Sequence, residues 1–443
     1  TPEAFGLVGM ITVFFAVAQV FIDSGFGQAY IQKKEVTHID ANTVFYTNLF
    51  ISLALYGILW LSAPLIARFY EEPKLIDLIH VMGLVIIINA FNVIQMAQLS
   101  RAINFKSMAK VNLVSTIIAG TSGITAAYYG LGVWSLVIQS LTNRFLSTAG
   151  LWVITKWKPT LQISKASFKE MFSFGSWILL ASIVRKIFDN IYILVIGKFF
   201  AIGDLGLYTK SKQFKVMISE QSSKAIGLVA FSVFSRVNYE NKKLRAVFKK
   251  FLQQSLLIIA PLLVLLIVIS KPFVILILTE KWMPMIPYLQ LFCLLGIIHP
   301  IRFFNIQNLL AKGKSKLIYQ LEMIQNGLRL LNIIIMFRWG ISYIIIGEII
   351  LTLLMTIIYS FYSKKLINYG FYGQLKDIKE ILIGAFIAGV LGFGAYSILD
   401  AQWSILLFSS FIILISFILS QYLFNKQIYQ EFISSLKTLK EKF

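Results

Sequence analysis

The chain of 443 residues contains few of the side chains from which disulfide, metal and catalytic sites are built. Its single cysteine, Cys293, excludes an intrachain disulfide and a thiolate metal cluster. The three histidines, His38, His80 and His299, lie far apart and lack the spacing of helical metal ligands. The sequence also lacks a phosphate loop, a nucleophile elbow and a paired-carboxylate signature. We therefore expect no metal site, no catalytic residues and no cofactor.

The chain has few charged residues and many long hydrophobic runs. Charged residues make up 14% of the chain and hydrophobic residues 58%, whereas soluble domains contain about 25% charged residues. The mean hydropathy is +0.77. A helix needs roughly 20 apolar residues to cross the hydrocarbon core of a bilayer. Runs of this length predict an all-α polytopic membrane protein with thirteen spans. They are 4–29, 43–68, 76–100, 107–129, 131–155, 170–200, 205–234, 247–270, 284–311, 315–338, 340–363, 378–399 and 402–424.

The net charge of +21 does not indicate nucleic-acid binding, because the basic residues follow the membrane topology. Twenty-six Lys and Arg residues lie in or beside the gaps after odd-numbered spans or in the tail, against nine for the even-numbered gaps. Basic residues are retained on the cytoplasmic side of a membrane. We therefore expect a multi-pass membrane protein with a cytoplasmic C-terminus and with Thr1 outside.

Short sequence matches recur in the same order along the chain, at offsets of 200 to 213 residues. Ala4-Phe5-Gly6-Leu7-Val8 is matched by Asp204-Leu205-Gly206-Leu207-Tyr208, and Asn92 by Asn305. This order indicates a duplicated unit of six spans, which gives two parallel halves. The second copy begins with span 170–200, whereas nothing corresponds to it before Pro2. We expect one N-terminal span to be missing, so that the complete protein has fourteen.

This organisation predicts four parts. They are an N-terminal lobe at 1–155 without its first helix, a cytoplasmic linker at 156–169, a C-terminal lobe at 170–363, and a helix pair with a basic tail at 364–443.

Five motifs follow one another along the chain. They are Phe5-Gly6-Leu7-Val8-Gly9-Met10, Asp23-Ser24-Gly25-Phe26-Gly27-Gln28-Ala29, Ala63-Pro64-Leu65-Ile66-Ala67-Arg68-Phe69-Tyr70, Ile196-Gly197-Lys198-Phe199-Phe200 with Leu205-Gly206-Leu207-Tyr208, and Glu280-Lys281-Trp282-Met283-Pro284. These motifs resemble those of the Wzx-type polysaccharide flippases of the multidrug/oligosaccharidyl-lipid/polysaccharide superfamily. The resemblance runs from residue 2 to about residue 375. It implies a two-lobe helical bundle like that of the multidrug exporters of this superfamily, working by alternating access.

The resemblance also implies a cargo and a place of work. The cargo would be an undecaprenyl-diphosphate-linked oligosaccharide, moved from the cytoplasmic to the outer leaflet of the bacterial inner membrane. Such units build surface polysaccharides, including O-antigen, lipopolysaccharide and exopolysaccharide. The implied role is transport without catalysis. The expected partners are this cargo, anionic membrane lipids, a polysaccharide polymerase of the same pathway, and a proton or sodium ion as the coupling ion.

Ionisable residues inside the predicted spans indicate where an anionic cargo would bind. Such residues are costly in a membrane and face a cavity or a charged partner. A diphosphate is anionic, and Arg and Lys are its usual ligands in proteins. We expect the sixth and seventh spans to form a cationic wall. The candidate cargo contacts are Arg185, Lys186, Lys224, Lys215, Arg144 and Arg302.

Two of these cations, Arg185 and Lys224, have a simpler interpretation as part of an ion pair within the scaffold. Asp189 lies one helical turn after Arg185, and Glu220 lies one turn before Lys224. A further cation, Arg329, could pair with Glu322 or Glu348. The candidates for ion coupling or gating are Asp23 and Asp189.

Two basic amphipathic segments, 236–251 and 428–442, fit helices that lie on an anionic cytoplasmic leaflet. Two other functions stay open for the chain. A cation-coupled multidrug exporter of the same superfamily would favour acidic liners. A membrane polymerase or ligase would need a large outer loop, whereas the longest predicted outer gap is only 271–283.

Overall fold

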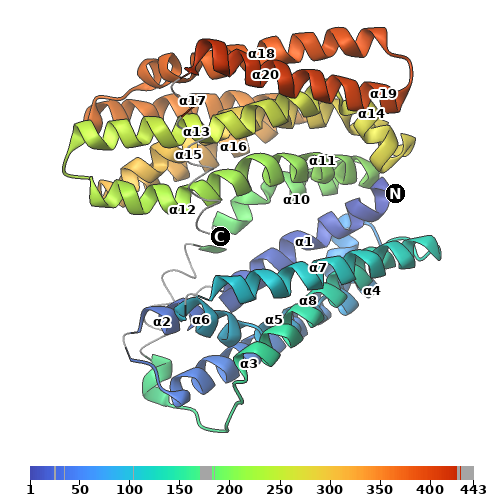
Figure 1. The fold of residues 1–443 in the computed structure, drawn as a ribbon. Helices are drawn as coiled ribbons and strands as arrows, with labels where there is room; N and C mark the ends of the chain where they lie inside the picture. Colours follow the sequence, from blue (N-terminus) through green and yellow to red (C-terminus); the bar gives the residue numbers. More distant parts are fainter. Residues whose placement is uncertain are drawn as a thin grey trace. The chain divides into compact units, whose positions relative to one another are not determined.

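The computed structural model describes residues 1–23, 26–33, 35–102, 104–169, 182–183, 185–426 and 430. Every regular element within these ranges is a helix. The chain forms two compact units, unit 1 at Thr1–Gly206 and unit 2 at Leu207–Phe443. Figure 1 shows both units as bundles of helices. The lobe boundaries expected from the sequence, 1–155 and 170–363, stay predictions.

Unit 1 is built from helices that follow the first predicted spans closely. The third span is broken into three helices at Gly83 and at Phe91–Asn92. The helices are α1 (Pro2–Asp23), α2 (Phe26–Gln32), α3 (His38–Tyr70), α4 (Leu75–Met82), α5 (Leu84–Ala90), α6 (Val93–Arg101), α7 (Phe105–Tyr128), α8 (Trp134–Thr155), α10 (Ile191–Phe199) and the first residues of α11 (Ile202–Lys215).

Unit 2 continues α11 through a π-helical turn into α12 and adds the remaining long helices. The elements are η1 (Val216–Glu220), α12 (Gln221–Arg236), α13 (Asn241–Val268), α14 (Ser270–Phe273), η2 (Val274–Leu278), η3 (Glu280–Met285), α15 (Ile286–Ala311), α16 (Ser315–Met336), η4 (Phe337–Trp339), α17 (Ile341–Ile367), α18 (Phe371–Ile398), α19 (Gln402–Ser404), η5 (Ile405–Ser409) and α20 (Ser410–Phe424).

Nine helical segments in the described part of the chain are long and apolar enough to cross a membrane. Three further predicted spans are helical but more polar, namely α8, the run α11–η1–α12, and α16. The remaining predicted span, 170–200, lies partly outside the described residues. The nine segments are Pro2–Ile22, His38–Tyr70, Leu75–Arg101, Phe105–Tyr128, Asn241–Val268, Glu280–Ala311, Ile341–Ile367, Phe371–Ile398 and Gln402–Phe424.

The core of unit 2 forms where α13 packs between α15 and α18 (Figure 1). Leu244 and Phe248, near the start of α13, are fully buried in this core with Phe304 of α15 and Ile378 of α18. The prediction that 236–251 lies on the membrane surface is therefore wrong for its apolar face. That face packs on protein, because α13 continues without a break from Asn241 to Val268. The other such segment, 428–442, lies outside the described residues except for position 430.

In unit 1, the predicted linker 156–169 is bonded along the start of α3. Asn42 Nδ2 donates to Thr160 Oγ1 at 2.6 Å, and the Thr160 backbone N–H donates to Asn42 Oδ1 at 3.1 Å. Further along, the Ser164 N–H donates to Thr43 Oγ1 at 3.0 Å. Trp157 packs into the core formed around Phe45. This segment is therefore a fixed part of unit 1 instead of a loose tether.

The two copies of the repeated glycine motif meet in unit 1, where α1 and the start of α11 cross. A Cβ atom on Gly6 would collide with the backbone carbonyl of Ile202, and one on Gly206 would collide with that of Pro2. Glycine at both positions is therefore required for the close approach of the two helix backbones. The matched motifs near residues 6 and 206 thus have a common structural role.

The end of α3 is tied to α10 on the surface of unit 1. Lys198 Nζ donates to Glu71 Oε1 at 2.7 Å. This hydrogen bond and the positive charge of Lys198 lower the pKa of the Glu71 carboxyl below its ordinary value. Lys198 belongs to one of the five family-like motifs, so this pair gives that motif a local structural role.

Candidate functional site

Unit 1 contains a polar cavity of about 350 Å³ between α1, α2, α5, α6 and α8. Arg144 on α8 lines it, together with Gln19, Asn89 and Asn92. Asn89 Nδ2 donates to Gln19 Oε1 at 2.6 Å. The Oδ1 atom of Asn92 is buried without a hydrogen-bond partner among the described residues. A guanidinium beside amide groups can bind both phosphate oxygens and sugar hydroxyls.

The break of the third span at Phe91–Asn92 places amide side chains in the wall of this cavity. Asn92 stands between α5 and α6, where its side chain caps neither helix. Asn89, near the end of α5, is held by Gln19 of α1. The sequence repeat matched Asn92 to Asn305, but no sequence signal selected Asn89, because a lone Asn in an apolar run has no distinguishing spacing.

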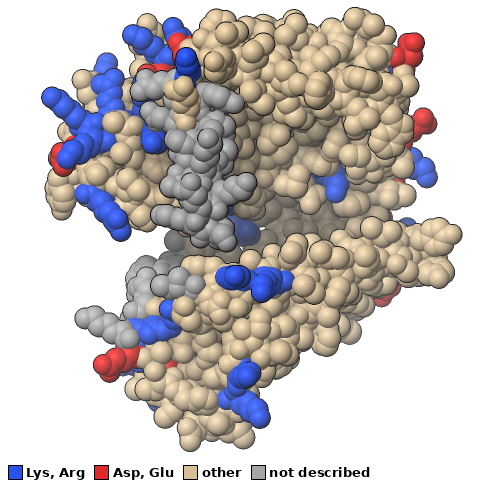
Figure 2. Space-filling model, viewed as in Figure 1, with Lys and Arg blue, Asp and Glu red and all other residues tan. Residues whose placement is uncertain are grey.

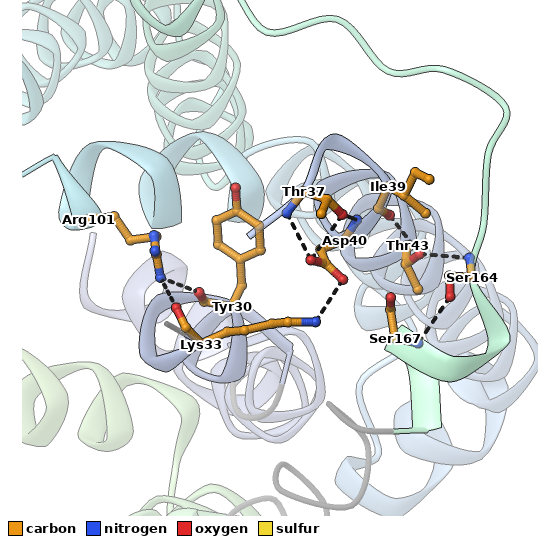
Figure 3. A network of polar contacts seen from close by, with 9 residues as sticks. All are labelled: Tyr30, Lys33, Thr37, Ile39, Asp40, Thr43, Arg101, Ser164 and Ser167. Atoms are coloured by element: carbon orange, nitrogen blue, oxygen red, sulfur yellow. Dashed lines mark hydrogen bonds and ion pairs between the residues drawn. The ribbon is translucent and has the colours of Figure 1, made fainter. Parts of the chain in front are cut away.

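A cluster of polar contacts fixes the α2–α3 connection, as Figure 3 shows. The same helix α2 lines the cavity with Gly27 and Ile31. Arg101, at the end of α6, donates from Nη1 to the backbone carbonyls of Tyr30 (3.0 Å), Ile31 (2.9 Å) and Lys33 (2.5 Å). These carbonyls lie at the C-terminal end of α2, where a helix has unpaired acceptors. The guanidinium therefore caps α2 and holds it against α6.

On the other side of the same connection, Asp40 anchors the start of α3 (Figure 3). Its carboxylate accepts from Lys33 Nζ at 3.1 Å and from the Thr37 N–H at 2.9 Å. The Thr37 hydroxyl caps α3 in return by accepting from the Asp40 N–H at 3.2 Å. Lys33 and Arg101 thus have structural partners, although the sequence counts them only as cytoplasmic cations.

Unit 2 has its own cavity, of about 550 Å³, between α12 and α15. Lys224 and Gln221 on α12 line it with Gln307 and Phe303 on α15. Lys224 is exposed and forms no ion pair within the described part of the chain. An ammonium group beside amides and an aromatic ring is again suited to a phosphorylated sugar.

Lys215 lies in a different environment, because it pairs with Glu220. Its Nζ lies 2.6 Å from Glu220 Oε1, and the Lys215 side chain is 11% exposed. The sequence suggested Lys224 as the partner of Glu220 at four residues' spacing. That interpretation is wrong because the π-helical turn Val216–Glu220 inserts an extra residue per turn, which aligns positions five apart.

Arg302 and Arg329 bind partners inside unit 2. Arg302 donates from Nη1 to Gln325 Oε1 at 2.7 Å, while its Nε is buried without a partner in the described ranges. Arg329 pairs with Glu348 at 3.1 Å, which decides between the two acids that the sequence left open. Arg302 does not line the α12–α15 cavity. Among the cations of unit 2, Lys224 therefore lines a cavity, whereas Arg302 and Arg329 bind partners in the interior.

The expected site residues of the sixth span are only partly described. Arg185 and Asp189 are exposed and Lys186 is partly buried, all in a helical segment that leads to α10. Residues 170–181 of this span and the side chain of Asp23 lie outside the described residues. The cargo-contacting role of Arg185 and Lys186, and the coupling role of Asp23 and Asp189, stay predictions.

Comparison with known proteins places this architecture in a family. A family model described as "Polysaccharide biosynthesis protein" matches residues 1–287. The chain belongs to this family of polysaccharide biosynthesis proteins. It is 26% identical over 304 residues to the teichuronic acid biosynthesis protein TuaB of Bacillus subtilis (strain 168), covering 68% of this chain and 63% of TuaB. It is 28% identical over 305 residues to the lipopolysaccharide biosynthesis protein WzxC of Escherichia coli (strain K12), covering 67% of this chain and 61% of WzxC.

The chain therefore spans less than two thirds of the length of these two relatives. Two solved structures are similar in fold. The lipid II flippase MurJ, in an inward closed conformation, has a TM-score of 0.77 at 15% identity and covers 97% of this chain and 94% of its own. An inward-facing multidrug transporter of the MATE family has a TM-score of 0.62 at 14% identity, covering 83% and 91%. These likenesses confirm the predicted polytopic, all-α membrane fold.

Proposed function

We propose that this protein moves a lipid-diphosphate-linked oligosaccharide from the cytoplasmic to the outer leaflet of the bacterial inner membrane. The family match over residues 1–287 carries this proposal. The relatives are named for the biosynthesis of teichuronic acid and lipopolysaccharide, and a third, ExoT of Rhizobium meliloti (strain 1021), for succinoglycan transport. The solved structure with a similar fold is named as a flippase of lipid II. In this proposal the protein is a transporter with a cytoplasmic C-terminus and catalyses no reaction.

We assign the first contacts with the cargo to Arg144 in unit 1 and Lys224 in unit 2. Each lines a cavity among amide side chains and forms no ion pair in the described part of the molecule. Arg185 and Lys186 stay in the proposal as further contacts. We give Lys215 a structural role instead, because Glu220 neutralises it. Arg302 is kept as an interior cation held by Gln325.

Deletion of the gene in its own bacterium tests the transport step. We expect loss of one surface polysaccharide, with its lipid-linked oligosaccharide accumulating on the cytoplasmic leaflet. A polymerase would give a different result, since its loss leaves single oligosaccharide units on the outer leaflet. Accumulation on the outer leaflet, or an unchanged polysaccharide, would contradict the proposal.

Point variants test the two cavities. Arg144→Gln and Lys224→Gln each remove a charge-assisted hydrogen bond to phosphate, which is worth about 1.5–3 kcal/mol. Transport of lipid-linked oligosaccharide in proteoliposomes should fall about 10- to 100-fold at limiting cargo. Lys110→Gln is the matched control, because Lys110 is exposed on α7 and lines neither cavity. Equal transport by all three variants would remove both residues from the site.

Coupling to a proton or sodium gradient is the remaining part of the proposal, with Asp23 and Asp189 as its candidate residues. Transport that is unchanged when either gradient is collapsed would remove this part. A multidrug exporter is the second candidate function, supported by the MATE-like fold at a TM-score of 0.62. Increased drug sensitivity of the deletion strain, with normal polysaccharide, would favour that function instead.

A further inference from the structure

The α12–α15 cavity of unit 2 places an aromatic ring in the same wall as the candidate phosphate contact Lys224. The ring belongs to Phe303 of α15, and Gly227 of α12 lines the cavity with it. The two helices pack along each other and end side by side, because Asn238 Nδ2, just after α12, donates to the Ala311 carbonyl at the end of α15 at 3.3 Å. They therefore run in the same direction, and positions along one helix can be matched to positions along the other.

The ring of Phe303 is held in one orientation by its neighbours. A Cβ atom on Gly227 would lie 2.5 Å from two atoms of this ring, so glycine leaves the space that the ring occupies. The fully buried ring of Phe304 stands at 86° to it, with 5.3 Å between the ring centres. His299 stacks with Phe303 at 5.9 Å and 29°. The cavity therefore has an aromatic surface whose position is set by the packing of α12 on α15.

Two amide side chains line the same cavity. Gln221 is exposed on α12, and Gln307 is partly exposed on α15, one turn after Phe303. Neither amide forms a hydrogen bond within the part of the chain that the structure describes. An amide group offers two donors and an acceptor with two lone pairs, and the faces of an aromatic ring are apolar. Together they suit a sugar, whose ring has apolar C–H faces and a rim of hydroxyl groups.

The groups that line the cavity follow one another at intervals of about one helical turn. Lys224, Gly227 and Phe231 are spaced by three and four residues, which correspond to rises of about 4.5 Å and 6 Å along α12. Phe303 lies against Gly227 and is therefore one turn from Lys224, toward the end of α12. Figure 2 shows Lys and Arg gathered over this end of unit 2, where α12 ends and α13 begins (Figure 1), which is the side predicted to be cytoplasmic. A phosphate at Lys224 and a ring on Phe303 could thus belong to adjacent groups of one molecule.

From this order of groups, we infer that Phe303 is the stacking surface for the sugar that is attached directly to the diphosphate of the cargo. Lys224 contacts the phosphate, with Gln221 beside it. The apolar face of the sugar lies against Phe303, and Gln307 contacts the hydroxyl groups. Gly227 is a positioning residue, because it leaves the space for the Phe303 ring. The inference rests on the proposed function and adds to it a site that distinguishes a sugar-bearing lipid from the bare lipid diphosphate.

The test measures the affinity of the purified full chain for two ligands by native mass spectrometry. One is the lipid-linked oligosaccharide that accumulates in the deletion strain, and the other is undecaprenyl diphosphate, which carries no sugar. The ratio of the two affinities reports recognition of the sugar. We expect Phe303→Leu to lower this ratio about fivefold, the lower end of the range for bases stacked on aromatic side chains. Phe303→Tyr keeps an aromatic face and should keep the ratio. Phe386→Leu, at an exposed position of α18 that does not line the cavity, is the matched control.

A second variant tests the positioning role without changing the ring. Gly227→Ala should displace Phe303 and lower the affinity ratio as Phe303→Leu does, because the added Cβ overlaps the ring. This variant also carries the test if Phe303→Leu does not fold. Gly327→Ala is its control, since Gly327 lies on α16 of the same unit and a Cβ there would meet nothing within 4 Å. Lys224→Gln should weaken both ligands by the same factor and leave the ratio unchanged, because both ligands carry the diphosphate.

Two outcomes would overturn this inference alone. Equal affinity of the wild type for both ligands would mean that the protein has no subsite for the sugar. A wild-type ratio in Phe303→Leu and Gly227→Ala would place the sugar elsewhere. If the deletion strain accumulates no lipid-linked oligosaccharide, or if neither ligand binds, the proposed cargo is wrong and the inference fails with it. Failure of the inference and failure of the proposed function are therefore distinguishable.

Discussion

The crossing of α1 with the start of α11 allows a sharp test of why the two glycine motifs are repeated. An alanine Cβ at Gly6 or Gly206 would overlap a backbone carbonyl of the facing helix, and a backbone cannot rotate away as a flexible side chain can. Gly57 on α3 and Gly120 on α7 are the controls, because a Cβ on either would meet nothing within 4 Å. All four positions are helical, so each substitution gains about 1 kcal/mol of helix propensity.

The propensity gain cancels when the crossing variants are compared with the controls, which leaves only the cost of the overlap. Overpacking typically costs about 1–3 kcal/mol, and we expect the upper end here because both helix backbones must separate. For a unit of this size about 3 kcal/mol corresponds to a difference in melting temperature of about 6–12 °C. The assay is thermal unfolding of the four single variants in detergent, followed by tryptophan fluorescence.

The double variant Gly6→Ala, Gly206→Ala sharpens the test. Once one Cβ has separated the helices, the second finds more room, so the combined loss should be smaller than the sum of the two. Strict additivity would mean that the two contacts are independent and not parts of one crossing. Crossing variants that melt with the controls would refute the close approach itself.

Three further predictions concern charged side chains. Arg329→Ala or Glu348→Ala should each destabilise unit 2 by about 3–5 kcal/mol, because a mostly buried charge loses its partner. The double variant Arg329→Met, Glu348→Leu should recover most of the folded protein in the membrane, because neither charge is then left unpaired. A double variant that folds no better than the single variants would contradict this account of the ion pair. Arg101→Ala should lower the free energy of unfolding by about 1.5–3 kcal/mol and speed amide hydrogen exchange in α2, because the α2 carbonyls lose their cap. Unchanged exchange would show that another group holds α2. Glu71→Gln should lower the melting temperature slightly at neutral pH, where the carboxylate is ionised and bonded to Lys198. Because the pKa of Glu71 is lowered in the folded protein, the difference in melting temperature between wild type and variant should disappear as the pH falls through that pKa. A difference that stays constant with pH would exclude the ion pair as its source.

The helical fold could be predicted from hydropathy because a membrane span has to satisfy its own backbone hydrogen bonds over a fixed length. This requirement applies to each span by itself and can therefore be read from consecutive residues. The predicted ranges 43–68 and 402–424 accordingly lie within α3 and within the run from α19 to α20. The interior of a span is less constrained. The breaks at Gly83 and Asn92 leave the mean hydropathy of the segment Leu75–Arg101 high at 2.0, yet the second break places Asn92 in the wall of the unit 1 cavity.

Apolar patterning was also insufficient to decide what covers a helix face. Leu244 and Phe248 stand among lysines on one amphipathic face, and both a lipid surface and a protein core satisfy that pattern. The structure buries both residues against α15 and α18, which are distant in sequence. Likewise, the bonds between Asn42 and Thr160 join positions 118 residues apart, and no spacing rule predicts such a pair.

The candidate cations show why charge and depth alone do not identify a binding site. Lys215 and Lys224 lie on the same helical run and look equivalent in sequence, with Glu220 between them. One π-helical turn decides which lysine the acid neutralises: Lys215 is paired at 2.6 Å, and Lys224 is left at the wall of a cavity. Lys215→Gln would leave Glu220 able to pair with Lys224, which lies four residues further along the helix. Transport should then fall as it does in Lys224→Gln, because Glu220 would neutralise the Lys224 ammonium group. A Lys215→Gln variant that folds and transports normally would show that the ammonium group of Lys224 does not contact the cargo.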